Sequence, residues 1–227
     1  MLPLDLHAPL SANVSTARHR GPGVWHALDP RRLLDSAFLY RIVQHTLAPR
    51  SSRIAFIEEY VRPGRHDHVL DIGCGPADDL EYMPDTVSYV GFDLSERYVQ
   101  AARSRWGDRG TFFQAAVSPT LLDGYEFDVV VANGVIHHLD DAETKSLLGL
   151  ARSVLKPAGR LVTKDPVLLE SQHPVSRYLA ERDRGGHVRY LGEYLNLADQ
   201  IFDEVSIVTR SDMLRCPYDH AIMIAHR

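Results

Sequence analysis

Short apolar runs alternate with longer segments in which apolar residues recur at helical spacing. The runs predict five strands, at about residues 67–72, 87–92, 111–115, 126–132 and 159–165. Between them, Ser95–Trp106 (with Ser95 as its N-cap) and Asp141–Leu155 carry apolar positions three and four residues apart, which predicts helices. Such an alternation of strand and helix favours a parallel sheet with helices on both faces.

The two ends of the chain follow other patterns. Residues 1–30 are rich in Pro, Gly and His, and we expect a loose arm there. Helical spacing then predicts one helix over Pro30–Ala48 and another over Ser51–Val61. Two apolar segments near the end, Phe202–Thr209 and Tyr218–His226, are expected to pair as antiparallel strands.

The first predicted strand ends at Asp71 and leads into a turn that contains Gly73 and Gly75. Glycine permits positive φ and lets a ligand lie against bare backbone. A dinucleotide-binding fingerprint would have a third glycine where Asp78 stands, beside Asp79. These carboxylates would repel a pyrophosphate, whereas they suit a ligand that carries an ammonium and a sulfonium.

The second predicted strand also ends in an acid, Asp93, which lies 22 residues after Asp71. In doubly wound nucleotide folds, an acid at this place accepts hydrogen bonds from ribose hydroxyls. The two strand ends together therefore indicate a nucleoside site with a positively charged group.

These residues resemble motifs of the class I S-adenosylmethionine (SAM)-dependent methyltransferases. Asp71-Ile-Gly-Cys-Gly-Pro-Ala77 resembles the first motif of that family, and Gly91-Phe-Asp93-Leu94-Ser95 resembles the second. Phe127-Asp-Val-Val-Val-Ala-Asn-Gly-Val-Ile-His-His-Leu139 resembles the fourth-strand motif, and Leu155-Lys-Pro-Ala-Gly-Arg-Leu161 resembles the turn into strand five. The four motifs occur in the family's order over about residues 65–165, which makes the resemblance specific.

The resemblance implies an α/β fold: a doubly wound, mostly parallel seven-stranded sheet with an antiparallel last strand and an N-terminal helical extension. It implies an arm and capping helices over residues 1–62, a SAM-binding core over 63–227, and an insertion over 166–192 that covers the acceptor pocket. The implied cofactor is SAM. The residues expected to hold it are Asp71, Gly73, Cys74, Gly75, Asp93, Leu94, Ala115, Ala116, Asn133, Gly134 and His138.

One motif departs from the family pattern. Many members have an Asp after strand three that binds the exocyclic amine of adenine, and here Ala116 takes that position. The site therefore lacks one hydrogen bond, worth about 0.5–1.5 kcal/mol net.

The acceptor side of the predicted pocket is less well defined. Leading helices in the family often roof the acceptor, so Tyr40 is a candidate to face it. The insertion carries a concentration of basic residues whose forks match a carboxylate or phosphate, and a solvated charged face is the other interpretation. The candidate acceptor-binding residues in and beside this basic group are Arg177, Arg182, Arg189 and Tyr190, with Arg184 and His187 nearby.

A hydroxyl acceptor or an acidic carbon needs a general base. His137 and His138, just after strand four, are candidates, as is His173 in the insertion; Asp165 is a weaker one. The histidine pair has a competing structural interpretation, because His-His-Leu is common there in the family. Metal-dependent catechol-type enzymes carry an Asp-Asn pair where Asp165-Pro166 stands, so we expect no metal.

Composition narrows the remaining possibilities. The net charge of −5 and the pI near 6.2 argue against a nucleic-acid partner. No apolar run approaches the length of a membrane span, and no signal peptide is evident at the N-terminus. Two cysteines do not make a disulfide framework. We therefore expect a cytoplasmic protein, monomeric or homodimeric, with no membrane partner.

The leading hypothesis is a SAM-dependent methyltransferase that acts on a small-molecule acceptor, with oxygen favoured as the methylated atom. A carboxylate or phosphate on the acceptor is a secondary expectation. Methylation of nitrogen or carbon in a natural product is an alternative, and so is a SAM-binding partner subunit without catalysis. A nucleotide-dependent oxidoreductase is disfavoured by Asp78.

Overall fold

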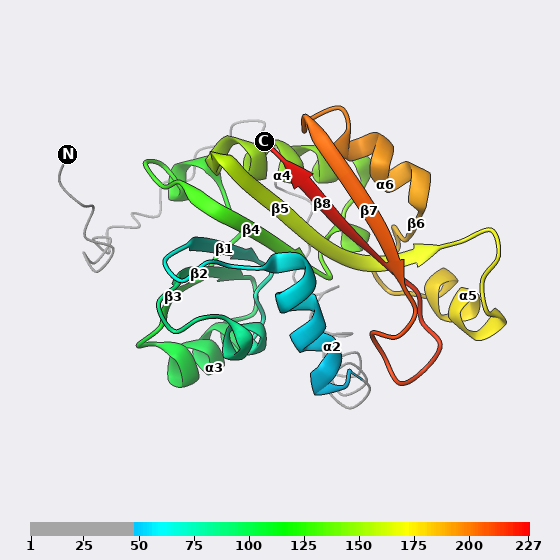
Figure 1. The fold of residues 1–227 in the computed structure, drawn as a ribbon, viewed down its shortest axis with the longest axis horizontal. Coiled ribbons are helices and arrows are strands. Elements are labelled where there is room, and N and C mark those ends of the chain that lie inside the picture. Colours follow the sequence, from blue (N-terminus) through cyan, green and yellow to red (C-terminus); the bar gives the residue numbers. More distant parts are fainter. Residues whose placement is uncertain (1–47) are drawn as a thin grey trace.

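The computed structural model describes residues 48–227 (Figure 1). The predicted arm, most of the helix expected over Pro30–Ala48, and the candidate residue Tyr40 lie outside the described residues.

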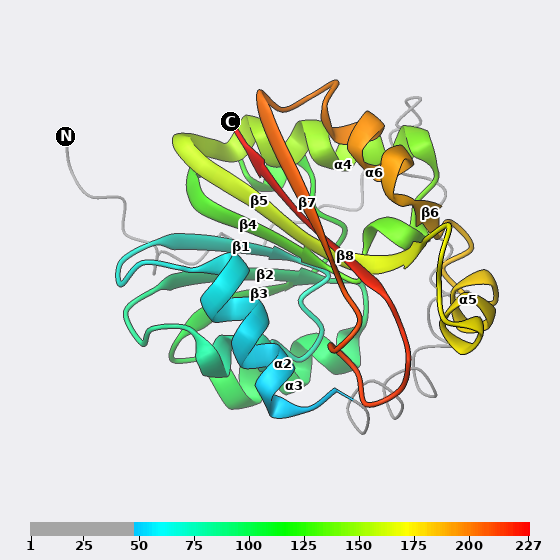
Figure 2. The same cartoon turned by 45° about the vertical axis from the view of Figure 1, so that its right-hand side comes forward.

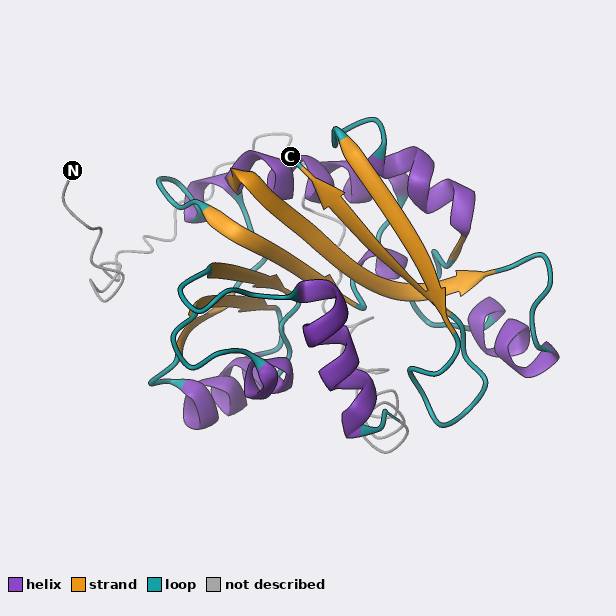
Figure 3. Ribbon diagram, in the orientation of Figure 1, coloured by secondary structure: helices purple, strands orange, loops and turns teal. Residues whose placement is uncertain are grey.

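The centre of the fold is one twisted sheet in the order β3-β2-β1-β4-β5-β8-β7, with the two-residue β6 paired to the end of β5 (Figures 1 and 3). Parallel pairing joins neighbours from β3 to β5, and β8 runs antiparallel to both β5 and β7. The predicted mostly parallel sheet with an inserted antiparallel last strand is thus confirmed. The strands are β1 (His68–Ile72), β2 (Ser88–Asp93), β3 (Gly110–Gln114), β4 (Phe127–Asn133), β5 (Leu155–Leu168), β6 (Arg189–Tyr190), β7 (Glu204–Arg210) and β8 (His220–His226).

Helices cover both faces of the sheet (Figure 2). On one face, apolar residues of α4 and α6 pack against Val130 and Ala132 of β4. On the other, which is the side of α2, residues of η1, η2 and α3 pack against Val129 and Val131 of the same strand. We call these the α4 face and the α2 face. The helical elements are α2 (Arg50–Ala55), η1 (Phe56–Val61), η2 (Asp78–Tyr82), α3 (Glu96–Trp106), η3 (Pro119–Leu121), η4 (Ile136–His138), α4 (Asp141–Val154), α5 (Pro174–Glu181) and α6 (Leu191–Ala198).

Several local predictions need refinement. The helix expected over Ser51–Val61 forms, but its second half is π-helical, and the backbone N–H of Arg62 bonds to the carbonyl of Ile57 at 2.7 Å. Ser95 is the N-cap residue of α3 as predicted, yet its side chain makes no capping hydrogen bond. Asp93 instead forms a turn just before the helix, because its Oδ1 accepts from the Ser95 N–H at 2.7 Å.

Strand β5 is longer at both ends than the predicted 159–165. Its extension reaches Leu168, and there it pairs with β6 of the segment that follows. This segment, expected to be an irregular insertion, contains α5 and leads through β6 into α6 (Figure 1). Among residues 48–227, no helix is both long enough and apolar enough to span a bilayer.

Candidate active site

The carboxyl ends of β1, β2 and β4 meet at one edge of the sheet, where an open α/β fold binds its ligands. The turn after β1 is fastened to β2 by backbone hydrogen bonds. The N–H groups of Gly73 and Cys74 both donate to the carbonyl of Phe92, at 2.8 and 3.0 Å. The Gly75 N–H donates to Asp93 Oδ2 at 2.9 Å. Asp93 therefore holds the turn from the tip of the neighbouring strand.

Both glycines of the turn adopt left-handed backbone conformations, with φ of 75° at Gly73 and 55° at Gly75. A Cβ at Gly73 would lie 2.7 Å from Cγ2 of Val135, so the site tolerates no side chain there. A Cβ at Gly75 would meet no atom within 4 Å. Bare backbone therefore faces open space at Gly75, as an approaching ligand requires.

Asp71 is the most unusual group at this edge. It is buried, its Oδ2 accepts a hydrogen bond of 2.5 Å from the Tyr89 hydroxyl, and its Oδ1 has no hydrogen-bond partner among the described residues. Burial raises the pKa of Asp71 to about 8, and the charges of Asp79 and Asp93 add to that rise. A cationic group that reached Oδ1 would satisfy the buried oxygen and restore the carboxylate.

The end of β4 joins the same cluster. Asn133 Nδ2 donates to Asp79 Oδ2 at 3.0 Å, and Gly134, with φ of 73°, donates its N–H to the carbonyl of Lys164. Arg53 of α2 lies within ion-pair distance of Asp78 and Asp79, at 3.4 and 3.8 Å. The acidic turn thus joins α2, β1 and β4.

The other residues expected to line the cofactor site lie in the turns that follow β1, β2 and β3. Cys74 is buried, and its Sγ lies 2.8 Å from the position that a Cβ at Gly91 would take. Burial raises the pKa of the Cys74 thiol, so the side chain is not a thiolate. Leu94, Ala115 and Ala116 are half-buried, in the turns that follow β2 and β3.

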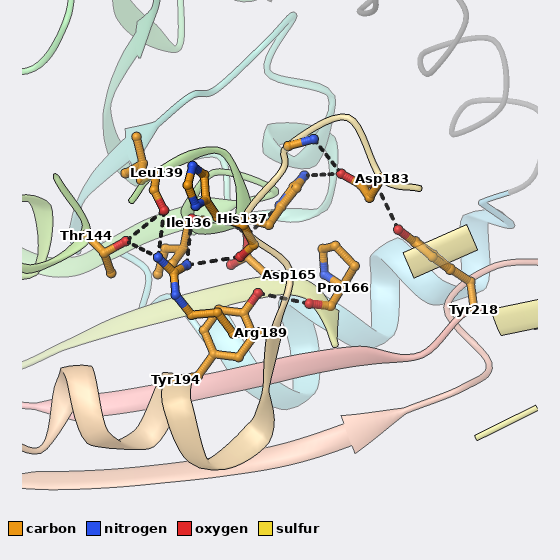
Figure 4. A network of polar contacts seen from close by, with 12 residues as sticks. Ile136, His137, Leu139, Thr144, Asp165, Pro166, Asp183, Arg189, Tyr194 and Tyr218 are labelled. Atoms are coloured by element: carbon orange, nitrogen blue, oxygen red, sulfur yellow. Dashed lines mark hydrogen bonds and ion pairs between the residues drawn. The ribbon is translucent and has the colours of Figure 1, made fainter. Parts of the chain in front are cut away.

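His137 lies at the centre of a second polar cluster, on the α4 face (Figure 4). Its ring is fully buried between two acids: Nδ1 is 2.8 Å from Asp165 Oδ1, and Nε2 is 3.5 Å from Asp183 Oδ1. The His137 carbonyl accepts from the His187 N–H, and a Cβ at Gly185 would lie 2.3 Å from the ring. His137 therefore fastens the loop after α5 to the end of β4.

The two other candidate bases have different surroundings. His138 is half-buried with its ring centroid 4.1 Å from that of His137, and burial together with His137 lowers its pKa to about 4. It is a neutral, weak base at pH 7. His173 is exposed and is the N-cap of α5, where its Nδ1 accepts from the Val175 N–H at 3.2 Å.

The basic group predicted in the insertion does not form one surface. Arg189 is buried, and its guanidinium donates to the carbonyls of Ile136 and Leu139 and to Asp141 (Figure 4). These contacts direct the guanidinium to the start of α4, and the role of Arg189 as an acceptor-binding fork stays a prediction.

The remaining members of that group differ in their surroundings. Arg177 donates to the carbonyl of Leu169, and Arg182 stacks on the exposed ring of Tyr178. Tyr190 is exposed and is the N-cap of α6. Arg182, Arg184 and Tyr190 thus remain accessible on the surface.

Comparison with known proteins agrees with this geometry. Residues 69–159 match the family described as "Methyltransferase domain". A Streptomyces fradiae protein described as "Uncharacterized 37.1 kDa protein in transposon TN4556" is 33% identical over 133 residues, which is 53% of this chain and 36% of that protein. The chain thus spans about a third of the length of this curated relative.

Solved structures show the same fold at low sequence identity. The Burkholderia thailandensis 1,6-didemethyltoxoflavin-N1-methyltransferase, solved with its acceptor and S-adenosylhomocysteine (SAH), has a TM-score of 0.66 at 20% identity, over 93% of this chain and 92% of that one. The plantazolicin methyltransferase BpumL, in complex with SAH, has a TM-score of 0.61 at 16% identity, over 89% and 92%. These likenesses concern the fold.

The matched residues and the strand order agree with the fold of the class I SAM-dependent methyltransferases, whose cofactor is SAM. The residues at the strand ends fit that cofactor. The unpaired Asp71 Oδ1 suits a cationic group, and the open space at Gly75 suits close approach of a ligand to the backbone.

Sequence patterns alone missed Tyr89 beside Asp71 and Asp183 beside His137, and they did not predict the contact of Asp79 with Asn133. Tyr89 belongs to an apolar strand and Asp183 to an irregular segment, so neither carried a local signal. Asp79 was seen only as part of an acidic run. Tertiary contacts give each of them its role.

Proposed function

We propose that this chain is a SAM-dependent methyltransferase whose acceptor is a small molecule methylated at oxygen. The observation that carries the proposal is the buried Asp71 carboxylate, half-satisfied by Tyr89 and open at Oδ1, at the tip of a glycine turn in a matched methyltransferase domain. When bound, SAM supplies an electrophilic methyl group on a sulfonium. The chain's part is to align acceptor and methyl group and to exclude water.

In this proposal Asp71 and Asp79 supply negative charge for the cofactor's cationic end, and Asp93 receives the ribose hydroxyls. The backbone at Gly73, Cys74 and Gly75 lets the cofactor lie close. Leu94, Ala115, Ala116 and the segment Asn133–Gly134 with His138 complete the surface around its adenine and methionine parts.

Calorimetry with SAH tests the cofactor site. We expect the wild-type chain to bind SAH and Asp93→Ala to bind it far more weakly, because that variant loses both the ribose acceptor and the hydrogen bond that holds Gly75. Asp123→Ala, at an exposed position outside the site, is the matched control. Absence of heat with SAH in the wild type would remove the basis of the proposal.

Transfer of labelled methyl groups from SAM to a small-molecule extract tests the activity. Label in esters or ethers supports an oxygen acceptor, whereas label in amines supports nitrogen methylation, the reaction of the Burkholderia thailandensis N1-methyltransferase that shares this fold. Binding of SAH without any transfer would favour a SAM-binding subunit without catalysis.

The proposal includes an acidic group on the acceptor. The exposed residues Arg182 and Arg184 lie in the segment between β5 and α6, which we propose covers the acceptor. An unchanged acceptor KM in Arg182→Ala would count against contact with Arg182.

A further inference from the structure

A lysine occupies the same edge of the sheet as the cofactor site, one strand further along. Lys164 of β5 pairs in register with Asn133 of β4, and on its other side with Ile222 of β8. Its neighbours at two-residue spacing, such as Val162, belong to the α2 face. Lys164 therefore points to the same face as Asp71 and Asn133, and it lies on the strand next to Asn133.

The environment of the Lys164 amine is unusual for a lysine. The residue is half-buried, but its Nζ lies 4.6 Å from the centroid of the fully buried Phe56 ring. Among the described residues, no hydrogen bond or ion pair to Nζ is present. Burial lowers the pKa of this amine. A half-buried amine that has a ring contact but no hydrogen bond or ion pair among the described residues is available for a ligand.

The charged and titratable groups around this amine come from several elements. Asp79 of η2 and Asp165 of β5 oppose the lowering of the Lys164 pKa, whereas Arg53 of α2 adds to it. His220 of β8 lies diagonally across from Lys164 on the α2 face. The surroundings are thus mixed in charge, with no carboxylate paired to Nζ among them.

His220 adds an independent sign of a polar site. It is 3% exposed, and its Nδ1 is buried without a hydrogen-bond partner among the described residues. Burial and the charge of Lys164 lower its pKa to about 3, so the imidazole stays neutral. The Nδ1 of His220 and the amine of Lys164 thus both lack a hydrogen-bond partner among the described residues, which marks a place where a polar ligand atom would be accepted.

The choice of lysine here also differs from the rest of the chain. Of the 25 Lys and Arg residues, only Lys145, Lys156 and Lys164 are lysines. Lys145 is exposed on α4, and Lys156 is paired with Asp128 at 2.7 Å. Arginine cannot give up its proton at ordinary pH, whereas a buried lysine can. The position next to Asn133 thus holds a lysine, which, unlike an arginine, can accept a proton as a general base.

We propose that Lys164, with His220 beside it, is the catalytic residue that receives the acidic proton of the acceptor, a phenol. This inference rests on the proposed function and names its acceptor class. It also agrees with the state of the predicted bases: His137 is enclosed by Asp165 and Asp183, and His173 caps α5.

The step balances as follows. The acceptor oxygen gives its proton to the Lys164 amine in its neutral form and becomes an oxyanion beside the new ammonium. A lone pair of that oxygen then forms the bond to the methyl carbon, while the carbon–sulfur bond breaks and its electron pair stays on sulfur. The ammonium afterwards releases its proton to water, which regenerates the amine.

Nuclear magnetic resonance on the protein labelled with [¹³Cε]lysine tests the state of the amine without an acceptor. The three signals are assigned with Lys145→Arg, Lys156→Arg and Lys164→Arg. In the SAH complex we expect the Lys164 signal to titrate at a lower pH than that of Lys145. Equal titration midpoints for the two would overturn the inference.

Methyl transfer then tests the role. The probes are labelled SAM with a panel of phenols, aromatic carboxylic acids and heteroaromatic amines. We expect transfer to phenols, and a loss of about 100-fold or more in kcat for both Lys164→Met and Lys164→Arg. SAH affinity should stay at the wild-type value in both variants, and the exposed Lys145→Met should keep full activity.

The outcomes separate the two levels of the hypothesis. Full activity in Lys164→Met, or recovery in Lys164→Arg, would overturn the role of Lys164 and leave the proposed function intact. Transfer to amines alone would overturn the acceptor class. A wild-type chain that transfers no methyl group to any probe would overturn the proposed function, and the inference with it.

Discussion

The hydroxyl of Tyr89 donates a 2.5 Å hydrogen bond to Oδ2 of Asp71, and both side chains are buried on the α2 face of the sheet. Tyr89 of β2 pairs with Val69 of β1, so the two partners lie on adjacent parallel strands two residues apart in register. This bond opposes the rise in the Asp71 pKa that burial causes. The relationship holds an acid at the tip of β1 with one oxygen satisfied and the other free for a ligand.

Tyr89→Phe removes that donor and leaves both Asp71 oxygens without a partner among the described residues. We expect a loss of about 1–3 kcal/mol in the free energy of unfolding, the cost of a buried group left unsatisfied. Urea denaturation measures it. Tyr125→Phe is the matched control, since the Tyr125 hydroxyl makes no hydrogen bond with the described residues, and it should be nearly neutral.

Binding of SAH should release protons at pH 7. The pKa of Asp71 is about 8 in the free protein, so the group is mostly protonated at pH 7 and must ionise to face a ligand ammonium. Affinity should therefore rise with pH up to about 8. Calorimetry in buffers of different ionisation enthalpy measures the protons released. Asp71→Asn should bind more weakly and release none at this site; equal proton release in that variant would exclude Asp71 as the source.

The two glycines of the turn should respond differently to alanine. Gly73→Ala combines a left-handed backbone with a Cβ 2.7 Å from Val135, whereas Gly75→Ala has the same backbone strain and open space. We expect about 1–2 kcal/mol of destabilisation from strain in Gly75→Ala and a larger loss in Gly73→Ala. Both should bind SAH poorly. Thermal unfolding and calorimetry measure the two effects, and wild-type SAH affinity in Gly75→Ala would mean that no ligand approaches there.

Removal of the His137 ring should loosen the loop after α5. His137→Ala leaves Asp165 and Asp183 without this partner, so we expect about 1–3 kcal/mol of destabilisation and faster proteolysis near residues 182–187. His173→Ala, at an exposed helix cap, is the comparison. Unchanged stability and protection, combined with complete loss of methyl transfer, would instead identify His137 as a base.

Arg189→Met should unfold more easily because the carbonyls of Ile136 and Leu139 lose their donor. The expected cost is about 1–3 kcal/mol. Arg184→Met, at an exposed arginine five residues earlier, should be neutral in the same denaturation experiment. A neutral Arg189→Met with a raised acceptor KM would restore the acceptor-binding role first expected for Arg189.

Local patterns were sufficient for the strands and most of the helices. Apolar runs and helical spacing depend on neighbours in sequence, and β1 to β4, α3 and α4 lie within a residue or two of the predicted bounds. The glycine turn and Asp93 could also be predicted, because strand ends in a parallel sheet meet at one edge. The carboxyl end of β5 could not be predicted, since it depends on pairing with a segment about 20 residues later.

The sequence by itself determined the fold class and predicted the cofactor and the acids expected to face it, because each depends on a short motif with a fixed backbone requirement. The tertiary structure alone decided which side chains remain free for chemistry. Arg189 is bonded to backbone carbonyls, and His137 lies between two acids. Among the described residues, one oxygen of Asp71 is buried without a hydrogen-bond partner, and the half-buried Lys164 amine has no hydrogen bond or ion pair. Whether a polar group is satisfied depends on atoms distant in the chain, and no local pattern records them.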